Sequence, residues 1–209
     1  MTDTRLYLIT PSKFDLDAFA GELENALEGG DVASLQLRMK DSYDEEIILA
    51  AKRLMPICHA KDVAFIINDR PDIANKVGAD GVHVGQEDMS YAKARELLGP
   101  DKIIGVTCKD SKHLAMTAGE QGADYVAFGS FFPTPTKITT SVAGPELLTW
   151  WQELFEVPCV AIGGITANNV TDIANAGADF VAICSGVWDH NDGPQKAVEL
   201  INKAISNNE

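Results

Sequence analysis

Short apolar segments alternate with longer amphipathic segments along the chain. Four of the apolar segments cover residues 6–9, 64–67, 103–106 and 160–162, and runs of this length are typical of buried β-strands. Between them, apolar positions recur at the helical period, as in residues 44–54 and 91–98. The pattern predicts strands that alternate with helices, which is typical of a parallel sheet.

A five-residue repeat indicates how many of these units there are. The pattern Gly-Ala-Asp-x-Val begins at residues 78, 122 and 177, and a degenerate copy begins at Gly29. In each copy the glycine suits a helix end, and the apolar run that follows suits a buried strand. The copies lie 49, 44 and 55 residues apart, about the length of two strand–helix units. We therefore predict an α/β fold: a single domain, residues 1–209, that forms an all-parallel, eight-stranded (β/α)8 TIM barrel rather than an open sheet.

The composition is that of a globular chain with a strong negative charge. Of the 209 residues, 45% are hydrophobic and 23% are charged, and the formal net charge is −14. This charge argues against nucleic acid or an anionic membrane as a partner. No apolar run approaches the roughly 18 residues of a membrane span, and the first residues do not resemble a secretory signal. We therefore expect a cytoplasmic protein that acts on small molecules, with its four cysteines as free thiols.

In a TIM barrel the active site lies at the carboxyl ends of the strands, and residues 34–40 bring cations there. If this segment is one strand, its alternation places Gln36, Arg38 and Lys40 on one face and apolar side chains on the other. The polar face would enter the mouth of the barrel. In a chain with a net charge of −14, two cations at one strand end favour an anionic ligand over a structural polar layer.

Two carboxylates follow neighbouring predicted strands. Asp69 comes after the apolar run at 64–67, and Asp88 comes after the next strand along the chain. Such oxygen ligands suit Mg²⁺, which usually takes one or two protein carboxylates together with substrate phosphate. Acids in these loops are also common helix N-caps, a role open to Asp72 and Glu87. The spacing alone leaves both roles open.

Three further strand ends have features of phosphate binding. Residues 130–144 form a hydroxyl-rich loop with a single lysine, Lys137, and loops of this length are often functional lids. Glycines follow the seventh and eighth predicted strands, at Gly163-Gly164 and at Gly186, where backbone N–H groups can approach a phosphate closely. The alternative for the loop is a surface insertion without a function, and the alternative for the glycines is that they only form tight turns. Because phosphate sites in TIM barrels are often built after strands seven and eight, we expect a phosphorylated ligand.

His83 has two interpretations. Aligning the repeat copies places His83 with Ala127 and Ala182. If this face points inward, the upper lumen is lined by small residues, and His83 is a polar residue within it. A hydrogen-bonded core histidine is favoured over a catalytic base, but both roles stay open, as does the role of Cys108.

Together these motifs resemble the thiamine phosphate synthase family over residues 6–194. The segments that carry the resemblance are Gln36-Leu37-Arg38-Met39-Lys40, Ile67-Asn68-Asp69-Arg70 with Asp72, Asp80-Gly81-Val82-His83-Val84-Gly85-Gln86 with Asp88, Phe132-Pro133-Thr134-Pro135-Thr136-Lys137, and Ala161-Ile162-Gly163-Gly164-Ile165. Five such segments at successive strand ends make coincidence implausible.

The resemblance implies a Mg²⁺-dependent transferase. In that reaction 4-amino-2-methyl-5-hydroxymethylpyrimidine diphosphate loses pyrophosphate, and 4-methyl-5-hydroxyethylthiazole phosphate captures the methylene carbon to give thiamine phosphate. By the same resemblance Asp69 and Asp88 hold the metal, and Arg38, Lys40 and Lys137 act as catalytic cations. The residues expected to bind substrate are Gln36, Arg38, Lys40, Asn68, Thr107 and Lys137 for the pyrimidine diphosphate, and Thr134, Thr136, Gly164, Cys184 and Ser185 for the thiazole phosphate.

A few positions depart from the family pattern. Thr107 stands where serine is common, Cys184 stands where isoleucine is common, and Cys108-Lys109 replaces a frequent Thr-His. None of these departures removes an expected metal or diphosphate ligand.

Other functions are compatible with this architecture. A related thiazole tautomerase typically lacks the full diphosphate set, and a non-catalytic sensor of thiazole phosphate or thiamine phosphate needs no metal pair. A sugar-phosphate epimerase is disfavoured by Asn68-Asp69-Arg70 and by the motif at 134–137. The synthase is therefore the preferred interpretation. A homodimer is compatible with a barrel of this size, although no residue identifies an interface.

Overall fold

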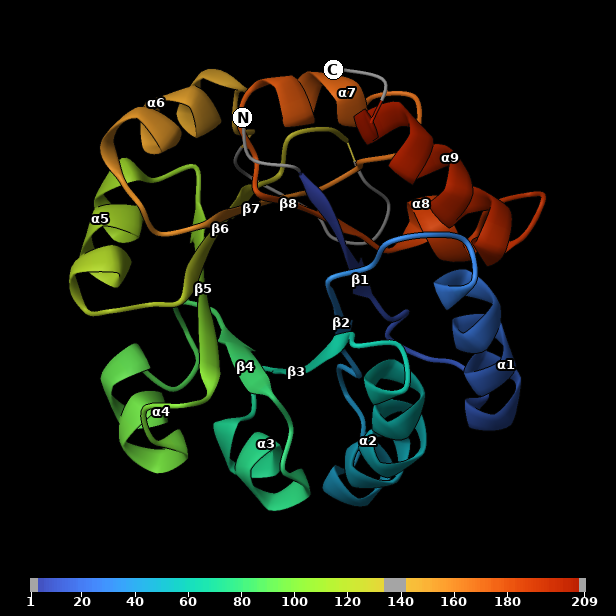
Figure 1. Cartoon of the computed structure of the whole chain (residues 1–209). Helices are drawn as coiled ribbons and strands as arrows, with labels where there is room; N and C mark the ends of the chain where they lie inside the picture. The colour runs from blue at the N-terminus through green and yellow to red at the C-terminus, as the bar shows by residue number, and fades with distance from the viewer. Residues whose placement is uncertain (1–3, 134–141, 207–209) are drawn as a thin grey trace.

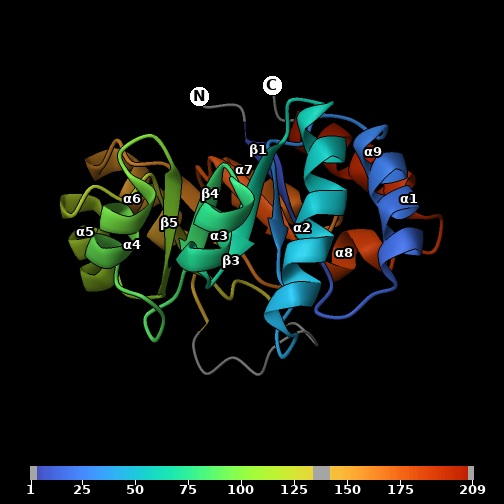
Figure 2. The same cartoon turned by 90° about the horizontal axis from the view of Figure 1, so that it is seen from below.

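The computed structural model describes residues 4–133 and 142–206. Eight strands close into a barrel in the order β1 to β8, and each neighbouring pair is parallel. Figure 1 looks into the ring of strands with the helices outside it, and Figure 2 shows the helices lying alongside the strands. The predicted all-parallel, eight-stranded TIM barrel is confirmed.

Strands and helices alternate as the sequence predicts, with one addition. The strands are β1 (Arg5–Ile9), β2 (Ser34–Leu37), β3 (Ala64–Asn68), β4 (Gly81–Val84), β5 (Ile103–Lys109), β6 (Tyr125–Gly129), β7 (Cys159–Ile162) and β8 (Phe180–Ile183). The helices are α1 (Leu16–Leu27), α2 (Asp44–His59), α3 (Pro71–Val77), α4 (Tyr91–Leu98), α5 (Lys112–Glu120), α6 (Glu146–Leu154), α7 (Val170–Asn175), α8 (Ser185–Trp188) and α9 (Pro194–Ser206). β8 is followed by two helices rather than one. Within the described ranges, no helix combines the length and apolar character that crossing a membrane requires.

The side chains of the strands form two cores. Outward-facing residues such as Leu35 and Leu37 are buried between the strands and the helices. Inward-facing residues fill the lumen, where a smaller apolar cluster consists of Tyr7, Ile9, Tyr125, Ala127, Val160 and Ala182. The alternation predicted for β2 is therefore correct, with the leucines outside and Gln36 buried on the other face.

The predicted strand over residues 34–40 is too long. β2 ends at Leu37, so Arg38 and Lys40 lie in the loop that follows it. The backbone N–H of Arg38 donates to Oγ1 of the fully buried Thr10 at 3.0 Å, instead of to a backbone carbonyl of β1. Because a side chain takes this N–H, the ladder stops there and the chain turns towards the mouth of the barrel.

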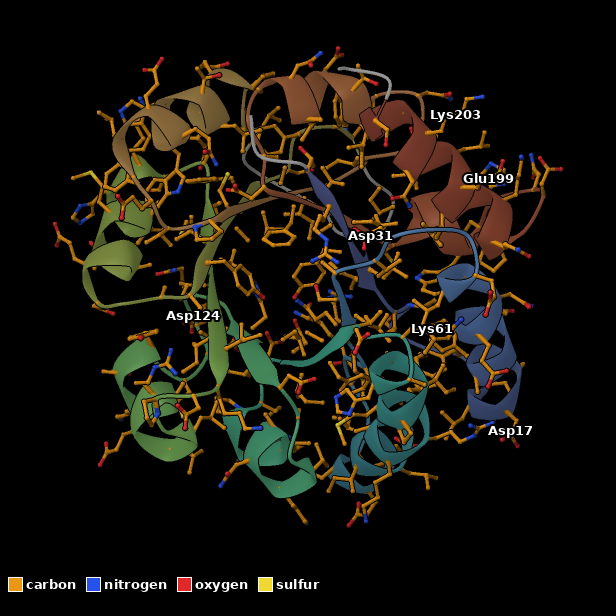
Figure 3. The ribbon with its side chains drawn as sticks, viewed as in Figure 1. Asp17, Asp31, Lys61, Asp124, Glu199 and Lys203 are labelled. Carbon is orange, nitrogen blue, oxygen red and sulfur yellow. The ribbon has the colours of Figure 1, made fainter. Side chains whose placement is uncertain are left out.

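The repeated aspartate ties each pair of strand–helix units together. Oδ2 of Asp124 accepts a hydrogen bond from the backbone N–H of Ile104, at the start of β5, at 2.7 Å, and another from Arg95 of α4 at 2.6 Å. Asp80 and Asp179 make equivalent contacts at the starts of β3 and β7, with His59 and Gln152 as helix partners. Figure 3 labels Asp124 beside β5, at the end of the barrel nearest the viewer. The repeat found in the sequence is therefore a set of hydrogen-bonded links at the amino ends of the strands.

Replacing Asp124 with alanine is expected to lower the free energy of unfolding by about 1–3 kcal/mol. The substitution leaves the Ile104 N–H without its acceptor and removes the ion pair of Arg95. Urea unfolding followed by circular dichroism measures the effect, and Asp101→Ala, an exposed position nearby, is the control. Equal stability of the two variants would contradict the structural role of the repeat.

Candidate functional site

A cavity of about 360 Å³ opens at the carboxyl ends of the strands. It is lined by ten of the residues that the sequence predicts as ligands: Gln36, Arg38, Lys40, Asn68, Asp69, Asp88, Thr107, Gly164, Cys184 and Ser185. The other three, Thr134, Thr136 and Lys137, lie outside the described residues. The fold thus brings together side chains that are up to about 150 positions apart in the chain.

The mouth of the cavity combines cations with a pair of carboxylates. Nζ of Lys40 lies 4.0 Å from Oδ2 of Asp69. Asp69 has a left-handed backbone conformation, with φ 62°, and its N–H donates to the His83 carbonyl oxygen at 2.7 Å. Such a conformation is uncommon outside glycine and is tolerated best by Asp and Asn. The backbone of Asp69 therefore directs its side chain into the cavity beside Asp88.

Electrostatics in this pair favour a bound cation. Burial and the neighbouring carboxylate of Asp88 raise the pKa of Asp69 to about 6, and Lys40 opposes the shift. Asp88 is held in place by the N–H of Gly85, which donates to its Oδ2 at 2.7 Å. Two adjacent ionised carboxylates repel each other, and a divalent cation would relieve that repulsion. The donor set of two carboxylates, with open room for substrate oxygens, fits Mg²⁺.

Asp72, which the sequence left open as a helix N-cap, is not one, since Arg70 holds the N-cap position of α3. Asp72 lies in the first turn of α3, after the Pro71 at which the helix begins, and it pairs with Arg70 at 2.7 Å. Neither Arg70 nor Asp72 lines the cavity. Glu87 does line the cavity, but α4 begins at Tyr91 with Ser90 as its N-cap, so Glu87 is not a helix cap either.

A chain of hydrogen-bonded side chains forms the floor of the cavity. It links Gln36 to Tyr7, Tyr7 to Tyr125, Tyr125 to His83, and His83 to Thr107 at 2.7–2.9 Å. All five residues line the cavity. The strand pattern identified Gln36 and His83, and the family resemblance implied Thr107, but neither pointed to the two tyrosines. The available signal was their inward position on the strand pattern, where a tyrosine must find a partner for its hydroxyl.

The floor is electrically neutral. Burial lowers the pKa of His83 to about 4, and burial raises the pKa of Tyr7 to about 12. The pKa of Tyr125 also lies well above its usual value for the same reason. These shifts keep the imidazole and both phenols uncharged near neutral pH, and both ring nitrogens of His83 are hydrogen-bonded, to Tyr125 and Thr107, which favours the interpretation of His83 as a lumen residue.

The glycine loops form the opposite wall. Gly163 and Gly164 have φ values of 108° and 64°, and a Cβ at either position would overlap the segment after β6 that contains Ser130 and Pro133. Only glycine permits this close approach of two backbones. Cys184, on the same side, remains a thiol because burial raises its pKa to about 11. The wall therefore offers backbone rather than ionised side chains to a ligand.

Lys109 is a further cation that the sequence did not single out as a ligand. It lies at the end of β5, where the register with β6 shifts between Thr107 and Lys109, and its φ is 56°. It lines the same cavity. The signal that could have identified it is the one used for Arg38: a cation at a strand end in an acidic chain.

A second cavity, of about 260 Å³, lies at the amino ends of the strands. Arg5 and Lys61 line it, but Arg5 pairs with Asp31 at 2.7 Å and Lys61 pairs with Glu28 at 2.6 Å. Figure 3 labels Asp31 and Lys61 at this end. Its cations are already neutralised, so the cavity at the carboxyl ends of the strands is the better candidate for an anionic ligand.

Comparisons with known proteins agree with the geometry of this cavity. The family model described as thiamine monophosphate synthase matches residues 6–187. The chain is 61% identical over 205 residues to a thiamine-phosphate synthase of Rhodospirillum centenum, covering 98% of this chain and 99% of that protein. It is 52% identical to a thiamine-phosphate synthase of Hyphomonas neptunium, and the match covers 95% of this chain and 92% of that protein.

Solved structures give the same result. The thiamine phosphate pyrophosphorylase from Pyrococcus furiosus is 35% identical and superimposes with a TM-score of 0.86, covering 99% of this chain and 97% of that one. A 3-hexulose-6-phosphate synthase with 18% identity and a TM-score of 0.72 shares the fold alone. On the family model and these relatives, the chain belongs to the thiamine monophosphate synthase family.

Proposed function

We propose that this protein joins 4-amino-2-methyl-5-hydroxymethylpyrimidine diphosphate to 4-methyl-5-hydroxyethylthiazole phosphate, with release of pyrophosphate, to give thiamine phosphate. The observation that carries the proposal is that one cavity brings Arg38, Lys40 and the Asp69–Asp88 pair together with glycine loops on the opposite wall. Such a cavity can hold a diphosphate at one side and a second phosphate at the other. Family membership supports the same reaction.

The cations stabilise the leaving group. As the bond to the methylene carbon breaks, negative charge develops on pyrophosphate, and Arg38 and Lys40 lie at the side of the cavity where that charge would form. Lys137, from the segment outside the described residues, is proposed as a third cation. The electron-rich pyrimidine supports positive charge on the methylene carbon, so the reaction requires no protein nucleophile.

Magnesium belongs to the proposal through Asp69 and Asp88. Bound there, it would neutralise charge on the diphosphate and on the leaving pyrophosphate. Asn68, beside Asp69 at the end of β3, adds a neutral amide to the same side of the cavity. A bound cation would offset the burial and the neighbouring carboxylate of Asp88, which together raise the pKa of Asp69.

The apolar walls protect the reactive carbon. Ile9, Val160 and Ile162 line the cavity with Ala127 and Ala182, and these side chains offer no nucleophile. A water molecule that reached the cationic methylene carbon would divert the reaction to the alcohol. Water exclusion by these walls, together with a thiazole phosphate held on the glycine loops, directs the carbon to the thiazole nitrogen.

The test is a direct assay with the purified protein, both substrates and magnesium. We expect thiamine phosphate and pyrophosphate to appear in equal amounts. Folded protein that forms neither product would contradict the proposal. Turnover of a thiazole carboxylate phosphate would then identify a tautomerase, and binding of thiazole phosphate without turnover would identify a sensor.

A further inference from the structure

The floor of the cavity contains one continuous hydrogen-bonded chain across five strands. Nε2 of Gln36, on β2, lies 2.8 Å from the Tyr7 hydroxyl, on β1, and that hydroxyl lies 2.9 Å from the hydroxyl of Tyr125, on β6. The Tyr125 hydroxyl lies 2.9 Å from Nδ1 of His83, on β4. Nε2 of His83 lies 2.7 Å from Oγ1 of Thr107, on β5. The two ends, Gln36 and Thr107, both face the ligand space.

One end of this chain dictates the donor at every link. The amide nitrogen of Gln36 can only donate, so the Tyr7 hydroxyl accepts from it and gives its own proton to Tyr125. Tyr125 then gives its proton to Nδ1 of His83. A neutral imidazole with an accepting Nδ1 carries its proton on Nε2, which therefore donates to Thr107.

The consequence at Thr107 is a directed hydroxyl. Because Oγ1 accepts from His83, its own proton remains available, and no second partner for this hydroxyl occurs among residues 4–133 and 142–206. At the other end, Gln36 donates one of its two amide N–H groups to Tyr7, which turns its carbonyl oxygen, without a partner among the described residues, towards the ligand space. The two ends therefore present opposite polarity.

We propose that the Tyr7–Tyr125–His83 relay makes Gln36 a hydrogen-bond acceptor and Thr107 a hydrogen-bond donor, and so selects an amino-substituted ring whose ring nitrogen is unprotonated. The ligand part rests on the proposed function: the exocyclic amino group of the pyrimidine donates to Gln36, and a ring nitrogen accepts from Thr107. A pyrimidine with a carbonyl in place of the amino group would meet the Gln36 oxygen with another acceptor. The three relay residues are positioning residues, since they act through Gln36 and Thr107.

The relay makes a prediction that needs no ligand: His83 carries its proton on Nε2. Long-range ¹H–¹⁵N correlation spectra of the imidazole distinguish the two tautomers, and His83→Gln identifies the signal among the four histidines. A proton on Nδ1 in the wild-type protein would overturn the proposal.

Reversal of the chain is the sharper test. In Gln36→Glu the ionised carboxylate can only accept, so Tyr7 must donate to it and each following link must turn round. We expect His83 to change to the Nδ1–H tautomer between pH 7 and 9, although Gln36 and His83 are separated by two tyrosines. An unchanged tautomer in folded Gln36→Glu protein would overturn the proposal. If this variant does not fold, the wild-type tautomer decides.

Binding measurements test the ligand end. We would use calorimetry with the pyrimidine diphosphate and with two analogues that each replace one ring nitrogen by C–H. The analogue that lacks the ring nitrogen facing Thr107 is expected to bind the wild-type protein about tenfold more weakly than the pyrimidine diphosphate does, because one hydrogen bond is lost. The Thr107→Val protein should bind this analogue and the pyrimidine diphosphate equally well. Thr107→Ser should behave as the wild type, and Tyr91→Phe, which loses a hydroxyl bonded to Gly122 outside the cavity, is the control.

The outcomes separate the two proposals. Equal binding of both analogues to the wild-type protein would overturn the donor role of Thr107. The Nε2–H tautomer in a protein that does not bind the pyrimidine diphosphate would leave the polarity of the floor in place and reject the proposed substrate instead.

Discussion

Replacing Asp69 with asparagine is expected to lower kcat/KM by about 10²–10³, the range for loss of one charge contact in a transition state. The same substitution should stabilise the metal-free protein. Burial and Asp88 raise the pKa of Asp69 to about 6, so its ionised form is less favourable in the folded chain than in the unfolded one. Asparagine also tolerates the φ of 62° at this position. A pKa raised by about two units corresponds to at most about 3 kcal/mol. Because the Asp69 side chain is 29% exposed and solvent screens its charge, we expect a gain of about 1 kcal/mol at pH 7, or about 2–4 °C in Tm.

The pH dependence follows from the direction of this shift. A carboxyl with a raised pKa in the folded state binds its proton more tightly there, so the stability that it contributes is present below about pH 4 and is lost as the pH rises through about 6. The stability difference between Asp69→Asn and the wild type should therefore grow over this interval. Magnesium should raise the Tm of the wild-type protein and should raise that of the variant much less.

Asp72→Asn is the matched control, because that carboxylate pairs with Arg70 and does not line the cavity. It should retain turnover and its response to magnesium. Thermal unfolding in chelator and in magnesium, together with steady-state kinetics, measures both effects. Retained turnover in Asp69→Asn, or equal stabilisation of both proteins by magnesium, would remove Asp69 from the metal site.

The second large effect is expected at Gly105, within β5. A Cβ at this position would overlap the ring of Tyr125, its partner in the register between β5 and β6. Gly105→Ala should therefore lower the free energy of unfolding by about 3 kcal/mol, the upper part of the range for overpacking. The corresponding loss in Tm is about 6–12 °C. The displaced Tyr125 ring should also weaken pyrimidine binding, since its hydroxyl is the central link of the floor.

Gly21→Ala is the control, because nothing lies within 4 Å of a Cβ at this position of α1. There the substitution should stabilise the protein by about 0.5–1 kcal/mol, the usual gain in a helix interior. Denaturant unfolding of both variants measures these changes in the free energy of unfolding. A Gly105→Ala protein as stable as the wild type would show that the ring can move at little cost.

Much of the fold was predictable because its signals are local. The repeat at residues 78, 122 and 177 predicted the number of strand–helix units, and each of its aspartates makes an equivalent link in the structure. The aligned lumen positions His83, Ala127 and Ala182 all line the cavity. Strand alternation depends on a residue's own neighbours, so it can be read without knowing the partners.

The errors arose where a partner from another element decided the outcome. β2 ends at Leu37 because the side chain of Thr10 takes the N–H of Arg38. Lys109 lines the cavity at the end of β5, at the point where the register of β5 against β6 shifts. The contact with Thr10 leaves no pattern in the segment that follows β2, whereas Lys109 does carry a local signal, a cation at a strand end in an acidic chain.

The eight strand–helix units, the repeat and the strand ends at the barrel mouth can all be recognised from local patterns in the chain. Two features exist only in the folded chain. Tyr7, Tyr125 and His83 link Gln36 to Thr107 through hydrogen bonds, and Asp88 lies close enough to Asp69 to help raise the pKa of Asp69. The physical reason is closure of the barrel. Periodicity assigns each side chain to the inside or the outside, but which inward side chains meet across the lumen depends on the stagger of eight strands around a ring.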